Sequence, residues 1–263
     1  MRARFFGPPS RRLFGVFDEP ATDDASDLGV VLCYPHGADY DTAFRAFRLL
    51  GTRLARAGFH VLRFDYLGTG DSSGDVDDAS ITQWVADVIA AVHELRSSHE
   101  LREVSLVGLR LGATLAALAA AECEGVNRVV LWEPVIDGRE YVAAQRALHR
   151  AWVDDEVRNG REALDTEEDL LGYRLTERLR RDLEGVSLWS LAKAPAPYLH
   201  VLSQKPSAEH ERLIEWLRAK GARVETDCIE GPTVWSRTPA MDEARVPSGV
   251  VQAIVTRLVG AAR

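Results

Sequence analysis

The sequence predicts an α/β fold in which helices cover both faces of a mostly parallel β-sheet. Apolar runs typical of buried strands alternate with segments of helical periodicity along most of the chain. Residues 137–192 break this alternation because they are charged and helical and contain no strand pattern. We therefore expect an α/β core of residues 1–136 and 193–263, with residues 137–192 inserted as a small helical cap.

The predicted strands are short apolar runs between turn residues. The run Gly-Val-Val-Leu-Cys-Tyr at residues 29–34 is apolar throughout, as expected of a strand buried on both faces. Two short strands near the amino terminus enclose a Gly-Pro-Pro-Ser turn. The strands are expected at residues 4–6, 13–17, 29–34, 60–64, 104–107, 128–132, 198–203 and 223–229.

Helices are predicted between these strands from the spacing of apolar side chains. Residues 44–54 carry Phe and Leu at helical spacing, and residues 81–95 carry an apolar stripe that follows the capping residue Ser80. Residues 111–121 are rich in Ala and Leu and are expected to form a central buried helix. Further helices are expected at residues 208–220 and after Pro247.

Charge and composition exclude several classes of function. The 263-residue chain has a net charge of −8, which argues against nucleic acid or an anionic membrane as the main partner. No window approaches about 18 uncharged apolar residues, so no membrane span is expected. The three cysteines are far apart, which predicts a cytoplasmic protein without disulfides. No metal-binding or nucleotide-binding motif is present in the sequence, so we expect no cofactor.

Three motifs follow three of the predicted strands. Residues 107–112 read Val-Gly-Leu-Arg-Leu-Gly between a buried strand and a buried helix, which is the pattern of a nucleophile elbow. Residues 34–37 read Tyr-Pro-His-Gly, where a backbone amide of an oxyanion hole is needed. An acidic, Gly-rich loop at residues 65–74 follows the next strand. Each motif is weak alone, but their order on successive strand ends is specific.

On these residues the chain resembles the alpha/beta-hydrolase superfamily, in its serine-aminopeptidase-like branch. The resemblance covers residues 29–132 well and the remainder loosely. It implies an alpha/beta-hydrolase fold with an eight-stranded, mostly parallel sheet and a helical cap after the sixth strand. It also implies a pocket at the carboxyl ends of the strands, and a tether from Asp65 to its neighbouring loop.

The chain departs from this family at the three expected catalytic positions. Arg110 occupies the elbow position, where the family has serine, cysteine or aspartate, and a guanidinium stays protonated. No Asp or Glu occurs in residues 202–206, and no histidine occurs in residues 230–235, where the family's acid and base are expected. Ordinary serine hydrolysis is therefore not expected, and an esterase or thioesterase would need an unrecognised nucleophile.

Three short sequence runs resemble those of particular groups within the alpha/beta-hydrolase superfamily. They are the Gly-Leu-Arg-Leu-Gly elbow, a Leu-Trp-x-Pro-Val run at residues 131–135 and a Gly-Pro-x-x-Trp run at residues 231–235. They look like the hydrolase-like proteins found beside exosortase systems. They also look like atypical hydrolase-fold members of natural-product pathways. Within that second group we expect the acetate-eliminating enzymes of spirotetronate biosynthesis, although the three runs do not single them out.

A cation at the amino terminus of a helix makes an anion-binding site. We expect the guanidinium of Arg110 and the amide of Leu111 to bind a carboxylate, an enolate or an acyl-ester oxygen. An amide from Gly37 or Ala38 would complete this site.

A structural role is the alternative for Arg110. The guanidinium would then pair with Glu133 or Asp137 and fill a site that has no catalytic activity. Glu133 follows the sixth predicted strand, so it is also placed to orient a base or to anchor the start of the cap.

His36 is the candidate general base, because histidine is the usual proton carrier near neutral pH. The alternative is a loop histidine that only shapes the turn. Tyr40 and Trp235 are expected to line the pocket or simply to pack. His210, which lies between two glutamates near a helix start, is expected to be solvated.

The residues together predict a biosynthetic enzyme of the lyase type that acts on an acylated, anionic small molecule. The most concrete reaction is elimination of acetate from an acetylated, tetronate-like polyketide intermediate, with an acyl carrier protein as a further candidate partner. The rival expectation is a catalytically silent hydrolase-fold protein that binds a ligand, a carrier protein or an enzyme.

Overall fold

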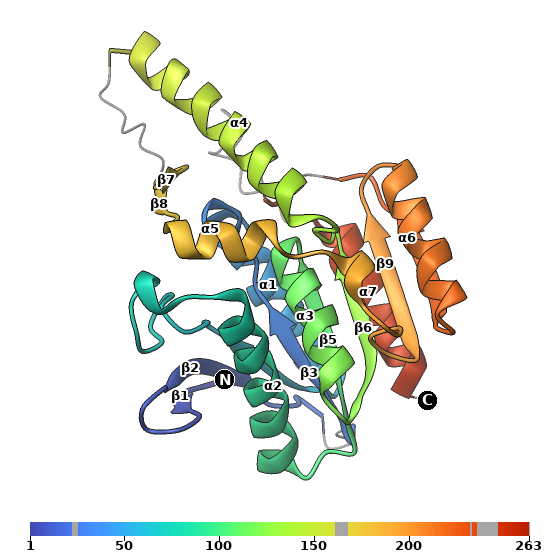
Figure 1. Cartoon of the computed structure of the whole chain (residues 1–263). Helices are drawn as coiled ribbons and strands as arrows, with labels where there is room; N and C mark the ends of the chain where they lie inside the picture. Colours follow the sequence, from blue (N-terminus) through green and yellow to red (C-terminus); the bar gives the residue numbers. More distant parts are fainter. Residues whose placement is uncertain (23–25, 161–167, 232, 236–246, 263) are drawn as a thin grey trace.

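An eight-stranded sheet runs through the centre of the computed structural model, which describes residues 1–22, 26–160, 168–231, 233–235 and 247–262 (Figure 1). The sheet has the order β1-β2-β4-β3-β5-β6-β9-β10. Only the β1–β2 and β2–β4 pairs are antiparallel among the strand pairs of the described sheet. The strands are β1 (Arg2–Phe6), β2 (Leu13–Asp18), β3 (Leu28–Cys33), β4 (His60–Phe64), β5 (Glu103–Leu109), β6 (Val126–Trp132), β9 (Tyr198–Ser203) and β10 (Arg223–Cys228).

Helices cover both faces of this sheet, as the alternating pattern predicts. Helices α1 and α7 pack together on one face, and α2 and α3 pack together on the opposite face (Figure 1). The helices are α1 (Ala38–Arg56), α2 (Ile81–His99), α3 (Leu111–Glu122), α4 (Gly138–Arg158), α5 (Glu177–Glu184), α6 (Ala208–Ala219) and α7 (Ser248–Ala262), with single 3₁₀ turns η1 (Val76–Asp78) and η2 (Leu188–Ser190).

Burial explains why the central elements form. Every residue of β3 is buried, because helices cover this parallel strand on both sides. Helix α3 is likewise buried around most of its circumference, which its Ala-rich and Leu-rich composition allows. Helix α2 begins where the Ser80 hydroxyl accepts a hydrogen bond from the Gln83 amide at 3.2 Å, so the predicted cap is confirmed.

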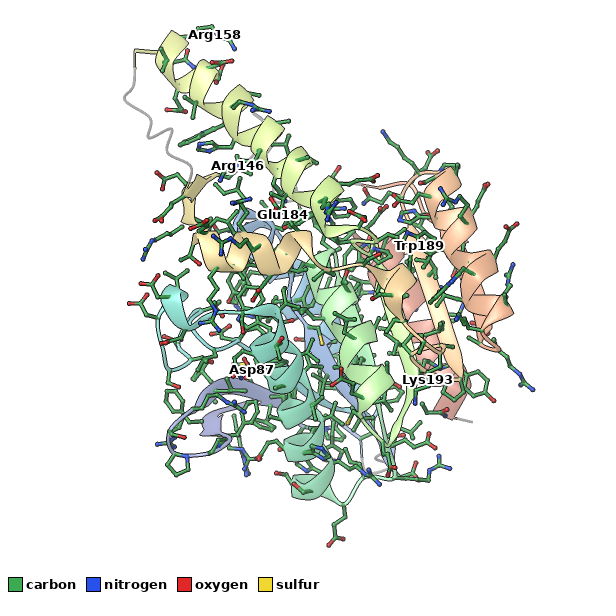
Figure 2. The ribbon with its side chains drawn as sticks, in the orientation of Figure 1. Asp87, Arg146, Arg158, Glu184, Trp189 and Lys193 are labelled. Carbon is green, nitrogen blue, oxygen red and sulfur yellow. The ribbon has the colours of Figure 1, made fainter. Side chains whose placement is uncertain are left out.

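The segment between β6 and β9 lies outside the main sheet, at its carboxyl edge. It contains α4, α5 and η2, and the end of α4 that carries Arg158 lies well away from the sheet (Figure 2). The expectation that this segment has no strand was wrong, because β7 (Asp169–Leu170) and β8 (Tyr173–Arg174) form a short hairpin. Leu171 and Gly172 both have positive φ, which is the backbone conformation of a tight two-residue hairpin turn.

The division into a core of residues 1–136 and 193–263 and a cap of residues 137–192 stays a prediction. Residues 161–167 of this charged segment lie outside the described residues. No helix in the described part of the chain has the length and apolar character needed to cross a membrane.

Candidate active site

The turn between β5 and α3 presents Arg110 at the carboxyl edge of the sheet. Arg110 has φ 53° and ψ −122°, a combination that residues other than glycine rarely adopt. Its backbone N–H donates a hydrogen bond to the carbonyl oxygen of Trp132 in β6 at 2.9 Å, which holds the turn in place. Backbone strain of this kind is concentrated at functional sites. The predicted elbow is therefore present, with arginine at its tip.

Two glycines allow this turn. A Cβ atom at Gly108 would collide with the carbonyl oxygen of Gly112, and a Cβ atom at Gly112 would collide with the carbonyl oxygens of Cys33 and Tyr34. The start of α3 therefore lies against both β5 and the end of β3. This close approach brings the loop that follows β3 beside the elbow.

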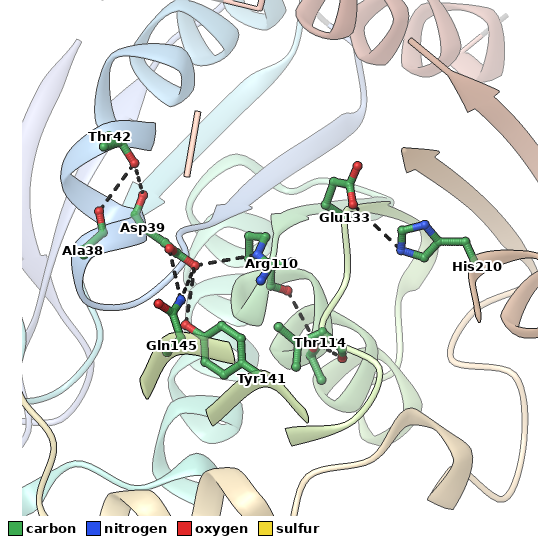
Figure 3. Close-up of polar contacts among 10 residues, drawn as sticks. Ala38, Asp39, Thr42, Arg110, Thr114, Glu133, Tyr141, Gln145 and His210 are labelled. Carbon is green, nitrogen blue, oxygen red and sulfur yellow. Dashed lines mark hydrogen bonds and ion pairs between the residues drawn. The ribbon is translucent and has the colours of Figure 1, made fainter. Parts of the chain in front are cut away.

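The guanidinium of Arg110 lies near the rings of Tyr141 and Trp235 and beside the carboxylate of Asp39. Figure 3 shows Arg110 with Asp39 and Tyr141. The Cζ of Arg110 lies 5.6 Å from the ring centre of Tyr141 and 5.7 Å from that of Trp235. Its Nε lies 3.7 Å from Asp39 Oδ2, an ion pair that is too long for a hydrogen bond. The side chain keeps 22% of its surface exposed, and nothing in the described part of the chain hydrogen-bonds its two terminal nitrogens. Arg110 therefore has donors available for a ligand.

The acidic partner of Arg110 is Asp39, so the alternative with Glu133 or Asp137 as counter-ion was wrong. Asp137 instead caps α4, because its Oδ1 accepts hydrogen bonds from two first-turn amides at 2.9 and 3.2 Å. The pairing was missed because α1 and the elbow are far apart in sequence and meet only in the folded sheet. Its one sequence signal is the position of Asp39, two residues after the predicted oxyanion turn at Gly37.

Glu133 connects the end of β6 to the segment that follows β9. Its Oε1 accepts a hydrogen bond from the Gln204 amide at 2.6 Å, and its Oε2 lies 3.9 Å from His210 Nε2. Glu133 has a φ of 46°, so its backbone turns sharply at the end of the strand. The expectation of a solvated His210 was wrong, because its side chain is only 13% exposed where it faces Glu133 (Figure 3).

Asp39 is buried in the first turn of α1, where the helix dipole favours a carboxylate. It accepts a hydrogen bond from the Tyr141 hydroxyl at 3.4 Å and hydrogen bonds from Gln145 Nε2 at 3.2 and 3.3 Å. Burial raises the pKa of Asp39 to about 6, although the Arg110 guanidinium and these hydrogen bonds oppose the shift. A carboxylate that titrates near neutral pH therefore ties α4 to the elbow.

Replacing Asp39 by asparagine should remove a pH dependence from the stability of the fold. The folded pKa of about 6 lies above the ordinary value of 3.8. Protonation of Asp39 therefore stabilises the fold fully at a pH below 3.8, and this stabilisation is lost as the pH rises through the pKa of about 6 that Asp39 has in the folded protein. This difference in pKa corresponds to about 3 kcal/mol of unfolding free energy.

The measurement is urea unfolding of the wild type and of Asp39→Asn at several pH values. Between about pH 4 and pH 7, the unfolding free energy of the wild type should fall by about 3 kcal/mol more than that of the variant. Parallel pH profiles for the two proteins would contradict this assignment of the buried charge.

His36 lies in the loop after β3, with its ring centre 4.7 Å from that of Trp84. Burial lowers the pKa of His36 to about 4, so the imidazole is neutral and able to accept a proton at pH 7. His36 also lines a small cavity of about 20 Å³ together with Tyr141 and Gln145, the two residues that hold Asp39. Among the described residues, no hydrogen bond, ion pair or ring contact joins His36 to Arg110.

A larger cavity of about 380 Å³ opens at the carboxyl ends of β3 and β4. It is lined by the loops after these two strands, including His36, by Tyr40 in the first turn of α1, and by Tyr173 of the β7–β8 hairpin. The Tyr40 hydroxyl donates a hydrogen bond to Asp65 at 3.3 Å, and Asp65 accepts a second one from the amide of Asp71 at 3.1 Å. The loop-tethering role predicted for Asp65 is therefore confirmed.

The predicted anion-binding amides lie at two neighbouring helix starts. Leu111 is the first residue of α3 and is almost fully buried. Gly37, with φ 66°, caps α1, and Ala38 is the first residue of that helix. Amides in the first turn of a helix have no partner within the helix, so both helix starts offer donors to an anion. Their contact with a ligand stays a prediction.

Residues 30–178 match the family model described as serine aminopeptidase, S33. None of the curated proteins matches this chain. Among solved structures, Est1E from Butyrivibrio proteoclasticus with bound ferulic acid has a TM-score of 0.69 and 14% identity, over 98% of both chains. An esterase from Pyrococcus furiosus has a TM-score of 0.62 and 16% identity, over 96% of this chain and 87% of the other. Proline iminopeptidase from Mycobacterium smegmatis has a TM-score of 0.58 and 14% identity, over 100% of both.

These structural likenesses confirm the predicted alpha/beta-hydrolase fold over nearly the whole chain. At such low identity, a structural likeness shows a shared fold and does not show a shared activity. The family match covers more than half of the chain and includes the elbow. The protein therefore belongs to the serine aminopeptidase S33 family of alpha/beta-hydrolase-fold proteins.

Proposed function

We propose that this protein is an enzyme that acts on an acylated, anionic small molecule without a nucleophilic triad. The observation that carries the proposal is the Arg110 guanidinium, which is partly exposed at the elbow and has no hydrogen-bond partner for its terminal nitrogens in the described part of the chain. A guanidinium is neither a nucleophile nor a base, but it binds a carboxylate through two parallel hydrogen bonds and can donate to the single oxygen of an enolate. The adjoining helix start adds a second attraction for an anion.

Elimination of acetate is the reaction that these groups favour. His36 takes a proton from the carbon beside an acidic carbonyl group of the substrate. Arg110 and the Leu111 amide stabilise the enolate oxygen that forms. The electron pair then makes a carbon–carbon double bond as the adjacent carbon–oxygen bond breaks, and acetate leaves with both of its oxygens. An acetylated tetronate, free or attached to an acyl carrier protein, is a substrate of this kind.

The short runs at the elbow and at residues 131–135 and 231–235 support the same proposal. They look like runs of the hydrolase-like proteins beside exosortase systems and of atypical hydrolase-fold members of natural-product pathways. Within the second group we infer the acetate-eliminating enzymes of spirotetronate biosynthesis. Neighbouring genes discriminate between these groups: polyketide genes favour the elimination, whereas exosortase genes favour a binding protein or an atypical esterase.

A binding protein without catalytic activity is the second candidate, favoured by the pairing of Arg110 with Asp39. A buried carboxylate 3.7 Å from Nε already neutralises part of the guanidinium charge. In that case the elbow holds an anionic ligand or the cap helix α4, and no bond is broken.

Purified protein is expected to be inert towards probes of serine hydrolases. The Thr114 hydroxyl in the first turn of α3 is buried and donates to the Val135 carbonyl at 2.6 Å, so it does not serve as a substitute nucleophile (Figure 3). We expect no labelling by a fluorophosphonate and no hydrolysis of nitrophenyl acetate above background, with a serine esterase as positive control. Stoichiometric labelling of any serine would reject the proposal and favour an esterase with an unrecognised nucleophile.

A further inference from the structure

Two histidines and one glutamate lie close together at the amino ends of the parallel strands, whereas Arg110 lies at their carboxyl ends. Glu19 directly follows β2, His60 is the first residue of β4, and His99 is the last residue of α2. Because β2 and β4 are antiparallel, with Asp18 opposite Val61, Glu19 is brought beside His60. The cluster therefore lies at the amino end of β4, whereas the elbow lies at the carboxyl end of β5.

The donor atoms of these three residues converge. One donor atom from each residue lies within 4.8 Å of the other two. Glu19 Oε2 lies 3.1 Å from His60 Nδ1 and 3.9 Å from His99 Nδ1. The two imidazole rings are in contact, with centres 4.0 Å apart and planes tilted by 30° to each other. Ligands about 2.0–2.2 Å from a tetrahedral zinc ion are separated by about 3.4 Å, which lies between the two measured distances.

Hydrogen bonds do not account for all three side chains of this cluster. His60 Nδ1 is within hydrogen-bond distance of Glu19, but the 3.9 Å separation from His99 is too long for such a bond. Among the described residues, no hydrogen bond is made to either ring nitrogen of His99. Two imidazoles turned towards one carboxylate oxygen are the donor set that a divalent transition metal prefers.

We propose that Glu19, His60 and His99 form a binding site for a divalent transition metal of the zinc class. The three ligands lie just after β2, at the start of β4 and at the end of α2, so a bound ion would join these three elements to one another. This donor set leaves one tetrahedral position for water. The site is independent of the elbow and of the reaction proposed for it.

The surroundings allow an ion and its water to enter. A cavity of about 170 Å³ adjoins the cluster and is lined by Glu19 and His99, together with Arg2 and Arg4. The charge of Arg4 is already compensated, because its Nη2 lies 2.9 Å from Glu94 Oε1. Arg2 is the remaining cation on the cavity wall, and its repulsion limits the affinity of the site.

The test is titration of the chelator-treated full chain, free of any affinity tag, with Zn²⁺ by calorimetry and with Co²⁺ by visible absorption. We expect one ion per chain and d–d absorption bands of nitrogen and oxygen ligands. His99→Ala and Glu19→Gln should each weaken binding by more than about 100-fold, because each removes a direct ligand. Glu19→Gln nearly preserves the side-chain volume, and circular dichroism checks that both variants are folded.

His93→Ala is the matched control, because His93 is an exposed histidine on the same helix. This variant should bind the metal as the wild type does. The proposal is overturned if the wild type binds no stoichiometric ion, or if binding in His99→Ala and Glu19→Gln equals that of the wild type. Thiolate absorption bands with Co²⁺ would likewise overturn it, because they would place the ion at a cysteine such as the exposed Cys228.

Discussion

Replacing His36 by alanine is expected to lower turnover of an acetylated tetronate by about 10²–10⁴-fold, the usual contribution of a general base. His36→Gln should give a similar loss, because glutamine keeps much of the volume of the ring but accepts no proton at neutral pH. The measurement is the rate of acetate release by the variants, with far-ultraviolet circular dichroism and thermal unfolding to show that they are folded. His93→Ala, an exposed change, should be as active as the wild type.

The pH dependence of the same reaction identifies the base. With a pKa of about 4, His36 stays deprotonated down to about pH 5, so kcat/KM should be level above that pH and fall below it. Were Asp39 the base instead, its pKa of about 6 would make kcat/KM fall already below about pH 7. Full activity of a well-folded His36→Ala variant would contradict the assignment and move the role to Asp39, Glu133 or Tyr40.

Replacing Arg110 by alanine is expected to weaken substrate binding or turnover by about ten- to hundredfold. This loss is the scale of one or two charge-assisted hydrogen bonds to an anion. Arg110→Lys should recover only part of it, because an ammonium keeps the charge but lacks the planar pair of donors. Calorimetric titration with the acetylated tetronate, combined with kinetics, measures both effects.

If Arg110 had only a structural role, its replacement would lower stability and leave ligand binding unchanged. Alanine leaves the buried carboxylate of Asp39 without its cation, which costs up to about 3–5 kcal/mol of stability when that carboxylate is ionised. This cost should shrink below about pH 5, where Asp39 is neutral, and it should largely disappear in the double variant with Asp39→Asn. Loss of ligand binding should persist in the double variant. A restored melting temperature together with unchanged ligand binding would contradict a functional role for Arg110.

The fold was predictable from the sequence because its signals are local. A fully apolar run such as residues 29–34 has few places in a domain other than a buried parallel strand, and the structure places β3 there. The elbow was predictable for a similar reason, since glycines on both sides of Arg110 are required within one turn. The β7–β8 hairpin was missed because its strands have only two residues each, too few to show a period.

The electrostatics of the site were not predictable, because they depend on contacts between distant segments. Asp39 reaches Arg110 only through the packing of α1 beside the elbow, and its hydrogen-bond partners come from α4. The cluster of Glu19, His60 and His99 escapes a search for metal motifs for the same reason, since no two of its members lie within one element. Contacts of this kind between charged or metal-binding side chains can therefore be identified only once the fold is known.

The central claim is that this site eliminates acetate without forming an acyl-enzyme, and oxygen isotopes test it most directly. The wild-type protein is incubated with an acetylated tetronate in water enriched in oxygen-18, and the released acetate is analysed by mass spectrometry. Elimination breaks the bond between the ring-side carbon and oxygen, so the acetate should contain no label and the organic product should gain a double bond. Hydrolysis attacks the acetyl carbonyl group, so an acetate carrying one labelled oxygen, with an alcohol as co-product, would contradict the account.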